Sequence, residues 1–112
     1  MLNIRPATAE DVGPLAMTVR AWVIEDGIKL AVMGYCIKEG QTVAWAEINP
    51  EWRAKSKWYA KELFVATKKV LDLVPRGPLY VMADPDVLDS QLFLQHLGFS
   101  ELEGETWVAS LK

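Results

Sequence analysis

Basic side chains crowd a short segment where a long helix is predicted to begin. Arg53, Lys55 and Lys57 alternate along the chain, and Lys61 follows one helical turn after Lys57. Such side chains bind phosphate oxygens, and a helix N-terminus adds backbone N–H groups to a phosphate site. The spacing therefore points to phosphate binding. A second interpretation stays open: the lysines form the solvated face of an amphipathic helix, at the end where the helix dipole disfavours cations.

Two further side chains are reactive by type. His96 is the sole histidine, a residue type that often takes part in proton transfer, although the last turn of a predicted helix also suits a favourable C-terminal charge or a simple surface residue. Cys36 has no cysteine partner and lies in an apolar run, so we expect a buried, small apolar side chain and a reducing compartment. A lone cysteine builds neither a disulfide nor a cysteine-rich zinc site, and we predict no metal.

The bulk composition limits the class of protein. With 112 residues, of which 51% are hydrophobic, the chain fits a single domain over residues 1–112. A net charge of -3 argues against general binding of polyanions, so no nucleic acid is expected. No basic leader opens the chain, and no apolar run reaches the roughly 18 residues of a membrane span. We therefore expect a soluble protein of the cytoplasm, without a membrane partner.

The elements that must position these residues begin with a short strand, residues 2–5, which ends at Pro6. Thr8 is a natural cap for a helix over about residues 9–19. Three β-rich runs follow, joined by turns at Asp26-Gly27 and around Gly40. They cover residues 21–25, 28–37 and 42–48. Short turns between successive strands predict an antiparallel meander.

In the second half the apolar period changes from two to 3.6. A helix is predicted over about residues 56–74, and Pro75 and Gly77 end it. A buried strand (79–83), a helix starting at Asp86 or Asp89 and ending before Gly98, an acidic bend (101–104) and a last strand (105–111) complete the chain. The predicted class is mixed α+β, in the order β-α-β-β-β-α-β-α-β, with a mostly antiparallel sheet of about six strands and three helices.

Three local runs, in this element order, resemble the GNAT superfamily of N-acyltransferases. They are the opening Ile4-Arg5-Pro6-Ala7-Thr8-Ala9-Glu10-Asp11, the run Asn49-Pro50-Glu51-Trp52-Arg53, and the ending Leu94-Gln95-His96-Leu97-Gly98-Phe99. The resemblance spans essentially the whole chain but is compressed, because the second helix of the family, between the first helix and the second strand, is missing. A small α+β module unrelated to this family stays open as an alternative.

The resemblance implies an acetyl-CoA site at the junction with the long helix. In the family, arginine or glutamine is followed, after two residues, by glycine, any residue, and glycine or alanine, so that backbone N–H groups can approach the pyrophosphate. Aligned on Arg53, the two glycine positions hold Ser56 and Trp58, and the tryptophan should crowd the cradle. The implied cofactor-binding residues are Ile48, Arg53, Ala54, Lys55, Ser56, Lys57 and Trp58.

The same resemblance implies one base and one missing acid. Glu47 lies on the strand that often supplies the family's general base, and the alternating run predicts that it shares a face with Val43 and Trp45. The other interpretation is a glutamate at the solvent end of a strand. Many members use a tyrosine as general acid four residues before the glycine of the last helix, where this chain has Leu94.

The resemblance, together with the residues that depart from it, implies two alternative functions. The first is acetyl-CoA-dependent N-acetylation of an unknown amine, with weak or lost activity. The second is a non-catalytic binding or structural protein, similar to the degenerate GNAT-like proteins of bacteriophage virions, which self-associates or holds a protein partner. Trp52 and Trp58 would then plug the cleft or anchor the partner, whereas Trp22, Trp45 and Trp107 are predicted to be core.

Overall fold

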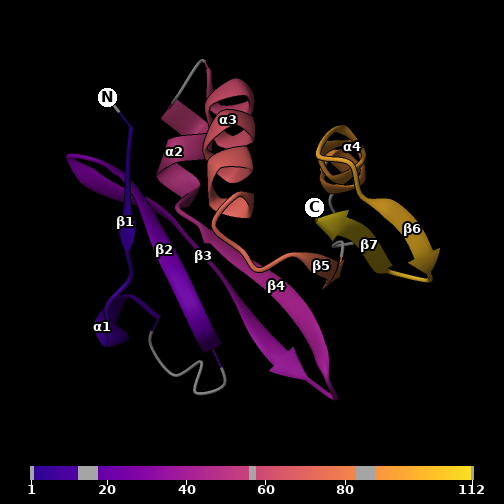
Figure 1. Ribbon diagram of the computed structural model, residues 1–112. Helices are drawn as coiled ribbons and strands as arrows, with labels where there is room; N and C mark the ends of the chain where they lie inside the picture. The colour runs from indigo at the N-terminus through magenta and orange to yellow at the C-terminus, as the bar shows by residue number, and fades with distance from the viewer. Residues whose placement is uncertain (1, 13–17, 56–57, 83–87, 112) are drawn as a thin grey trace.

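The structure is a computed structural model, which describes residues 2–12, 18–55, 58–82 and 88–111. Its described residues form one seven-stranded sheet in the order β1-β2-β3-β4-β5-β7-β6, with four helices (Figure 1). In chain order the elements are β1 (Asn3–Pro6), α1 (Ala9–Val12), β2 (Thr18–Asp26), β3 (Ile28–Lys38), β4 (Gln41–Ile48), α2 (Pro50–Lys55), α3 (Tyr59–Leu71), β5 (Gly77–Met82), α4 (Leu88–His96), β6 (Ser100–Glu103) and β7 (Thr106–Leu111).

Strands β2, β3 and β4 form the predicted antiparallel meander, and β1 adds an antiparallel strand beside β2. Its hairpin turns use left-handed backbone, with φ of 75° at Gly27 in the first, and of 52° at Glu39 and 79° at Gly40 in the second. In the second turn, two consecutive left-handed residues match the right-handed twist of the strands they join, and in the first turn Gly27 alone takes the left-handed conformation that glycine tolerates. Both turns predicted from the sequence are therefore confirmed.

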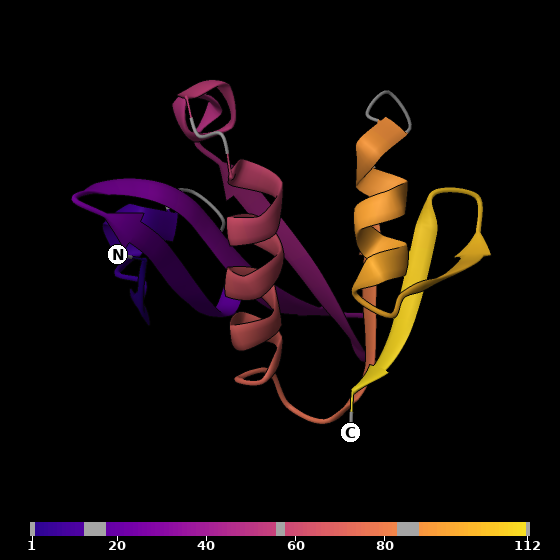
Figure 2. The same cartoon turned by 90° about the horizontal axis from the view of Figure 1, so that it is seen from above.

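Helices α3 and α4 cover one face of the sheet (Figure 2). Helix α3 buries Leu63, Ala66 and Val70 against β2, β3 and β4, as its 3.6-residue period predicts. Helix α4 buries Leu94 in a smaller cluster with β5 and β7. The opposite face has thinner cover, since α1 is only four residues long.

Three details of the predicted order are wrong. The helix predicted over residues 9–19 cannot extend so far, because Thr18 and Val19 belong to β2 and Thr18 is in register with Cys36. Residues 13–17 of this predicted helix lie outside the described residues. The apolar run of β2 gains more by pairing with β3 and burying Ala21 to Ile24 than a surface helix could provide.

The acidic bend predicted over residues 101–104 is instead strand β6, paired with β7. All four of its residues are exposed at the sheet edge, so Glu101 and Glu103 keep their hydration while the backbone joins the ladder. The turn moves to Gly104, whose φ is 56°. The sheet therefore has seven strands in place of about six.

The predicted helix over 56–74 also divides differently. Pro50–Lys55 forms a separate helix, α2, and α3 begins only at Tyr59, so the described chain has four helices in place of three. Helix α2 starts locally for a clear reason: Pro50 occupies its first position, and the Asn49 side chain Oδ1 accepts the Glu51 backbone N–H at 3.0 Å.

Candidate functional site

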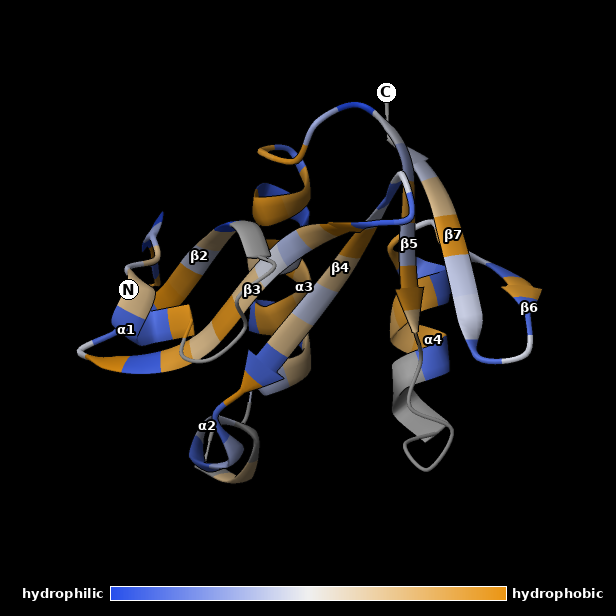
Figure 3. Ribbon diagram, turned by 90° about the horizontal axis from the view of Figure 1, so that it is seen from below, coloured by the Kyte–Doolittle hydropathy of each residue, from blue (hydrophilic) through white to orange (hydrophobic). Residues whose placement is uncertain are grey.

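The sheet divides between β4 and β5. These neighbours are parallel, and their register contains only two pairs, Thr42 with Leu79 and Val43 with Tyr80. Strand β4 continues to Ile48 and β5 to Met82, and the two diverge into a fork (Figure 3). Along this stretch the backbone edge of β4 that faces β5 has no strand partner, so its N–H and C=O groups can accept an extended ligand.

Helix α3 begins at the wide end of this fork. Trp58 is its N-cap residue, and no side chain caps the helix there. The first intrahelical bond runs from the Glu62 N–H to the Trp58 carbonyl at 2.9 Å. The N–H groups of a first helical turn have no acceptor within their own helix and carry the positive end of the helix dipole, which suits an anion. An open backbone edge on β4 and a helix N-terminus that suits an anion thus follow one another along the chain.

The predicted cofactor residues are spread along the connection between β4 and α3. Ile48 ends β4 and is half-buried against the core, and Ala54 is exposed on α2. Arg53 and Lys55 have helical backbone in α2, and their side chains are not described. Ser56 and Lys57 lie outside the described residues, so the glycine-loop alignment stays a prediction.

The two tryptophans that flank this connection differ. Trp52 is 5% exposed and packs edge-to-face on Tyr59, with ring centroids 5.1 Å apart, so it belongs to the core and presents no binding surface. Trp58 is 63% exposed at the start of α3. Of the other tryptophans, Trp22 and Trp107 are buried as predicted, whereas Trp45 is only half-buried.

Asn49 fixes the place where the chain leaves the sheet, and sequence reasoning missed this role. Besides capping α2, it donates its backbone N–H to the Leu30 carbonyl at 2.8 Å and its side-chain Nδ2 to the Lys29 carbonyl at 3.0 Å. It therefore ties the end of β4 to a bulge of β3, where Leu30 has no register partner in β2. The Asn-Pro dipeptide before a glutamate was the available signal.

Glu47 is exposed on the face of β4 that points away from α3. In the β3–β4 register it pairs with Val32, and Trp45 pairs with Gly34, which places Val43, Trp45 and Glu47 on one face as predicted. Its role as a base remains a prediction. Tyr80 shares this face, because it is in register with Val43.

The remaining candidates lie as follows. Leu94 is 9% exposed inside the α4 cluster, so this position supplies no proton donor. His96 is exposed on the last turn of α4, in agreement with a surface position. Cys36 is half-buried in β3, in place of the predicted buried position. Sequence reasoning passed over Tyr80, because only the strand register places it at the point where the fork opens.

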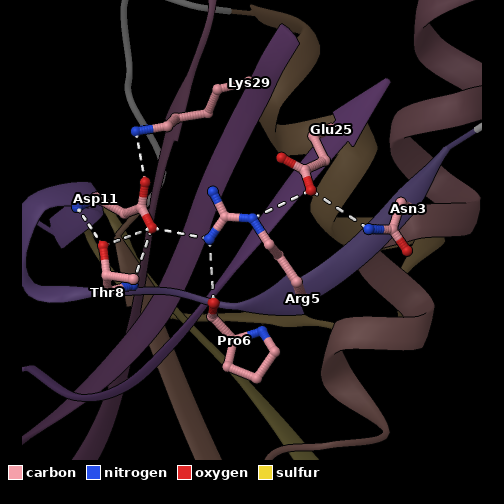
Figure 4. Close-up of polar contacts among 7 residues, drawn as sticks. All are labelled: Asn3, Arg5, Pro6, Thr8, Asp11, Glu25 and Lys29. Atoms are coloured by element: carbon pink, nitrogen blue, oxygen red, sulfur yellow. Dashed lines mark hydrogen bonds and ion pairs between the residues drawn. The ribbon is translucent and has the colours of Figure 1, made fainter. Parts of the chain in front are cut away.

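A separate polar network ties β1, α1 and β2–β3 together (Figure 4). Arg5 bonds Asp11 at 2.9 Å and Glu25 at 3.1 Å, and Lys29 bonds Asp11 at 2.6 Å. Asp11 also accepts the Thr8 backbone N–H at 2.8 Å, while the Thr8 hydroxyl accepts the Asp11 N–H at 3.4 Å, a capping box that confirms Thr8 as the cap of α1. Arg5 foremost, then Lys29 and Thr8, hold the pKa of Asp11 well below its usual range.

This network has a structural role, because its cations and carboxylates satisfy one another. Elsewhere, the described residues contain no group of three or more metal-ligating side chains. Within the same ranges, no helix is long and apolar enough to span a membrane.

Comparison with solved structures identifies the fold. The chain is similar to a chain of the crystal structure of AtaTR bound with AcCoA, at 16% identity and a TM-score of 0.58, over 97% of this chain and 92% of the other. It is equally similar to a chain of the KacTA–DNA complex, at 15% identity and a TM-score of 0.57, over 98% and 93%. No family model matches the chain, and no curated protein matches its sequence. The fold is GNAT-like, a mixed α+β sheet that divides at a parallel pair.

Proposed function

We propose that the protein binds acetyl-CoA in the β4–β5 fork and acts on an amine as an N-acetyltransferase of weak activity. The observation that carries the proposal is the short parallel register, which stops at Val43 and Tyr80 and leaves the β4 edge without a strand partner from there to its end at Ile48. The solved AtaTR structure, which is bound with AcCoA, shares this fold.

The residues present fit an acyl-CoA. The free edge of β4 offers alternating N–H and C=O groups to the amides of an extended pantetheine arm. The uncapped N-terminus of α3 suits its pyrophosphate, and Lys61, exposed on the first turn of α3, adds a cation. Glu62 in the same turn contributes an opposing charge, so we expect modest affinity. When bound, acetyl-CoA would supply the thioester carbon that an amine attacks.

The chain's own residues limit the chemistry. Glu47 would take up the proton of the attacking ammonium, directly or through water, from the open face of β4. At the α4 position a buried leucine offers nothing to the departing thiolate, so the thiol would have to be protonated from solvent or from another side chain. General acid catalysis typically contributes about 100-fold or more, and its absence from α4 supports weak turnover.

Calorimetric titration with acetyl-CoA tests the proposal, with a matched pair of lysine variants on one helix. Lys61→Ala should weaken binding, whereas Lys69→Ala, exposed in the last turn of α3, should leave it unchanged. Loss of a single phosphate contact of this kind lowers affinity by about 3- to 10-fold. If millimolar acetyl-CoA produces no heat and no rise in melting temperature, the proposed function fails.

A second candidate is a binding protein without turnover. It is favoured by the buried Leu94 and by Trp58, a large aromatic side chain left 63% exposed where a partner could anchor. This candidate predicts that no CoA thiol is released in the presence of amines, whether or not acetyl-CoA binds. Self-association, a virion-associated role, a cytoplasmic location and the absence of nucleic-acid binding stay predictions.

A further inference from the structure

The ring of Trp45 on β4 occupies space that is free because Gly34 on β3 has no side chain. A Cβ at Gly34 would lie 2.6 Å from the Arg20 carbonyl oxygen, 2.8 Å from the Ala21 Cβ and 2.9 Å from Cζ2 of Trp45. The φ of Gly34 is ordinary, so this glycine serves to leave space. The six-membered ring of Trp45 lies against the backbone of the neighbouring strand because residue 34 has no side chain.

The ring is fixed by packing on this face of the sheet. Trp45 packs against the buried cluster of Ala21, Val23 and Val32, as Ala7 and Val12 do from the α1 side. Its Nε1 is buried and has no hydrogen-bond partner among the described residues. A buried indole N–H usually finds an acceptor. The ring position is therefore set by the gap at Gly34, and the side chain stays half-buried, with part of its surface left on the open face.

The two faces of β4 differ along the fork. On the helix side Ala44 and Ile48 pack against the clusters under α4 and α3, and the exposed Ala46 between them offers only a methyl group. The opposite side carries both a ring, Trp45, and a charge, Glu47, so we place the acceptor there. Since successive same-face residues of a strand lie about 7 Å apart, a group held at Glu47 can place a short stem over Trp45.

The negative charge of Glu47 favours a positively charged group on the acceptor. Strands β4 and β5 are described completely, and Glu47 carries their only formal charge. The nearby cations Arg5 and Lys29 are paired with Asp11 and Glu25. A carboxylate beside a tryptophan ring attracts an ammonium group, both by its charge and through the negative face of the indole.

We infer that Trp45 and Glu47 together form the acceptor site, and that the acceptor is a primary amine on a short apolar or aromatic stem. Glu47 faces the ammonium group, and the indole of Trp45, positioned by Gly34, carries the stem. The inference rests on the proposed function, since it assigns the second substrate of the same site.

The test uses two probes of similar shape and opposite charge, phenethylamine and 3-phenylpropanoate. The readout is the indole N–H signal of Trp45 in a ¹H–¹⁵N spectrum, assigned by its loss in Trp45→Phe. We expect phenethylamine to shift this signal saturably in the millimolar range and 3-phenylpropanoate to leave it in place. Glu47→Gln should weaken phenethylamine binding by about 3-fold, as for other exposed charge pairs.

Trp45→Leu and Gly34→Ala complete the design, with binding followed by saturation transfer to the phenethylamine protons. Both variants should abolish the preference for the amine, the first by removing the ring and the second by displacing it. Equal binding of the two probes, no shift of Trp45 by either, or unchanged binding in Trp45→Leu would overturn the inference. Acetyl-CoA titrated into the same sample separates the two proposals. Binding of acetyl-CoA without binding of phenethylamine refutes only the acceptor site. Binding of phenethylamine without binding of acetyl-CoA refutes the proposed function.

Discussion

The two halves of the sheet are built differently, although they share one face for their helices. The meander half, β1 to β4 with α2 and α3, buries a cluster of ten described residues. The half made of β5, β6, β7 and α4 buries four, Leu79, Leu94, Phe99 and Trp107. The two halves are joined by two register pairs, by the edge-to-face contact of Phe64 on α3 with Phe93 on α4, whose ring centroids are 6.4 Å apart, and by Ala44, Leu71 and Val74, which pack against the smaller cluster. Beyond Val43 and Tyr80 no strand pairing joins the two halves, and β4 and β5 separate into the fork.

Removing the largest side chain of each half should have the largest effect. Trp107→Ala and Trp22→Ala each delete a tryptophan that is 3% or less exposed, and should lower the free energy of unfolding by about 3–5 kcal/mol. Urea unfolding monitored by fluorescence and by circular dichroism measures this loss. We expect one transition with coincident probes in both variants. Two separate transitions would show that the halves are independently stable, and would contradict the single-domain prediction.

Gly34→Ala tests the packing of the meander half. The added Cβ would lie 2.6 Å from a backbone oxygen of β2, which cannot move without shifting the strand, so we expect a loss of about 1–3 kcal/mol of unfolding free energy. Ala31→Gly, at a buried position of the same strand, shows what the loss of a packed methyl group and of β-propensity costs without any added volume. An equally stable Gly34→Ala protein would mean that β2 and β3 separate easily.

Asn49→Ala tests how the fork is held at its wide end. It removes the cap of α2 and the bond to the Lys29 carbonyl, which should cost about 1 kcal/mol. Since the same residue fixes where the chain leaves β4, acetyl-CoA binding should weaken as well. Asn49→Asp keeps the cap and loses only the Nδ2 donor, so it should recover most of the stability. Full stability of Asn49→Ala would contradict the structural role of Asn49.

Asp11→Asn should make the meander half less sensitive to acid. Because the folded-state pKa of Asp11 is lowered by Arg5, Lys29 and Thr8, its stabilising effect is present above the unfolded pKa of about 3.9 and is lost as the pH falls below it. The wild type should therefore lose stability between neutral pH and pH 3 more steeply than the variant. Parallel stability curves would show that the network contributes little. Urea midpoints measured across this pH range decide the matter.

Trp58→Ala should have the smallest effect on stability. The side chain is 63% exposed, so the urea midpoint should stay within the ±0.5 kcal/mol typical of surface substitutions. A change in acetyl-CoA affinity without a change in stability would place Trp58 in the binding site. Destabilisation by more than this range would instead assign the side chain to the packing of α3.

Much of the fold could be predicted from local signals. The Asp26-Gly27 and Glu39-Gly40 turns and the alternation through Trp45 required no knowledge of distant residues. The helix starting at Ala9 was predicted too long, and a bend was predicted where β6 lies, because pairing with β3 and β7 outweighs local propensity. Trp52, predicted either to plug the cleft or to anchor a partner, lies in the core, because sequence neighbours do not show which side of α2 meets the core.

The sequence by itself determined the meander, the amphipathic α3, the absence of a proton donor at Leu94, and the single charge on β4 and β5. These follow from residue type, period and turn chemistry, all of which act over a few residues. Only the tertiary structure decided that β4 and β5 part after Val43 and Tyr80, and that Gly34 makes room for Trp45. Those features join segments far apart in the chain, and their geometry arises from strand register and packing, which no local pattern specifies.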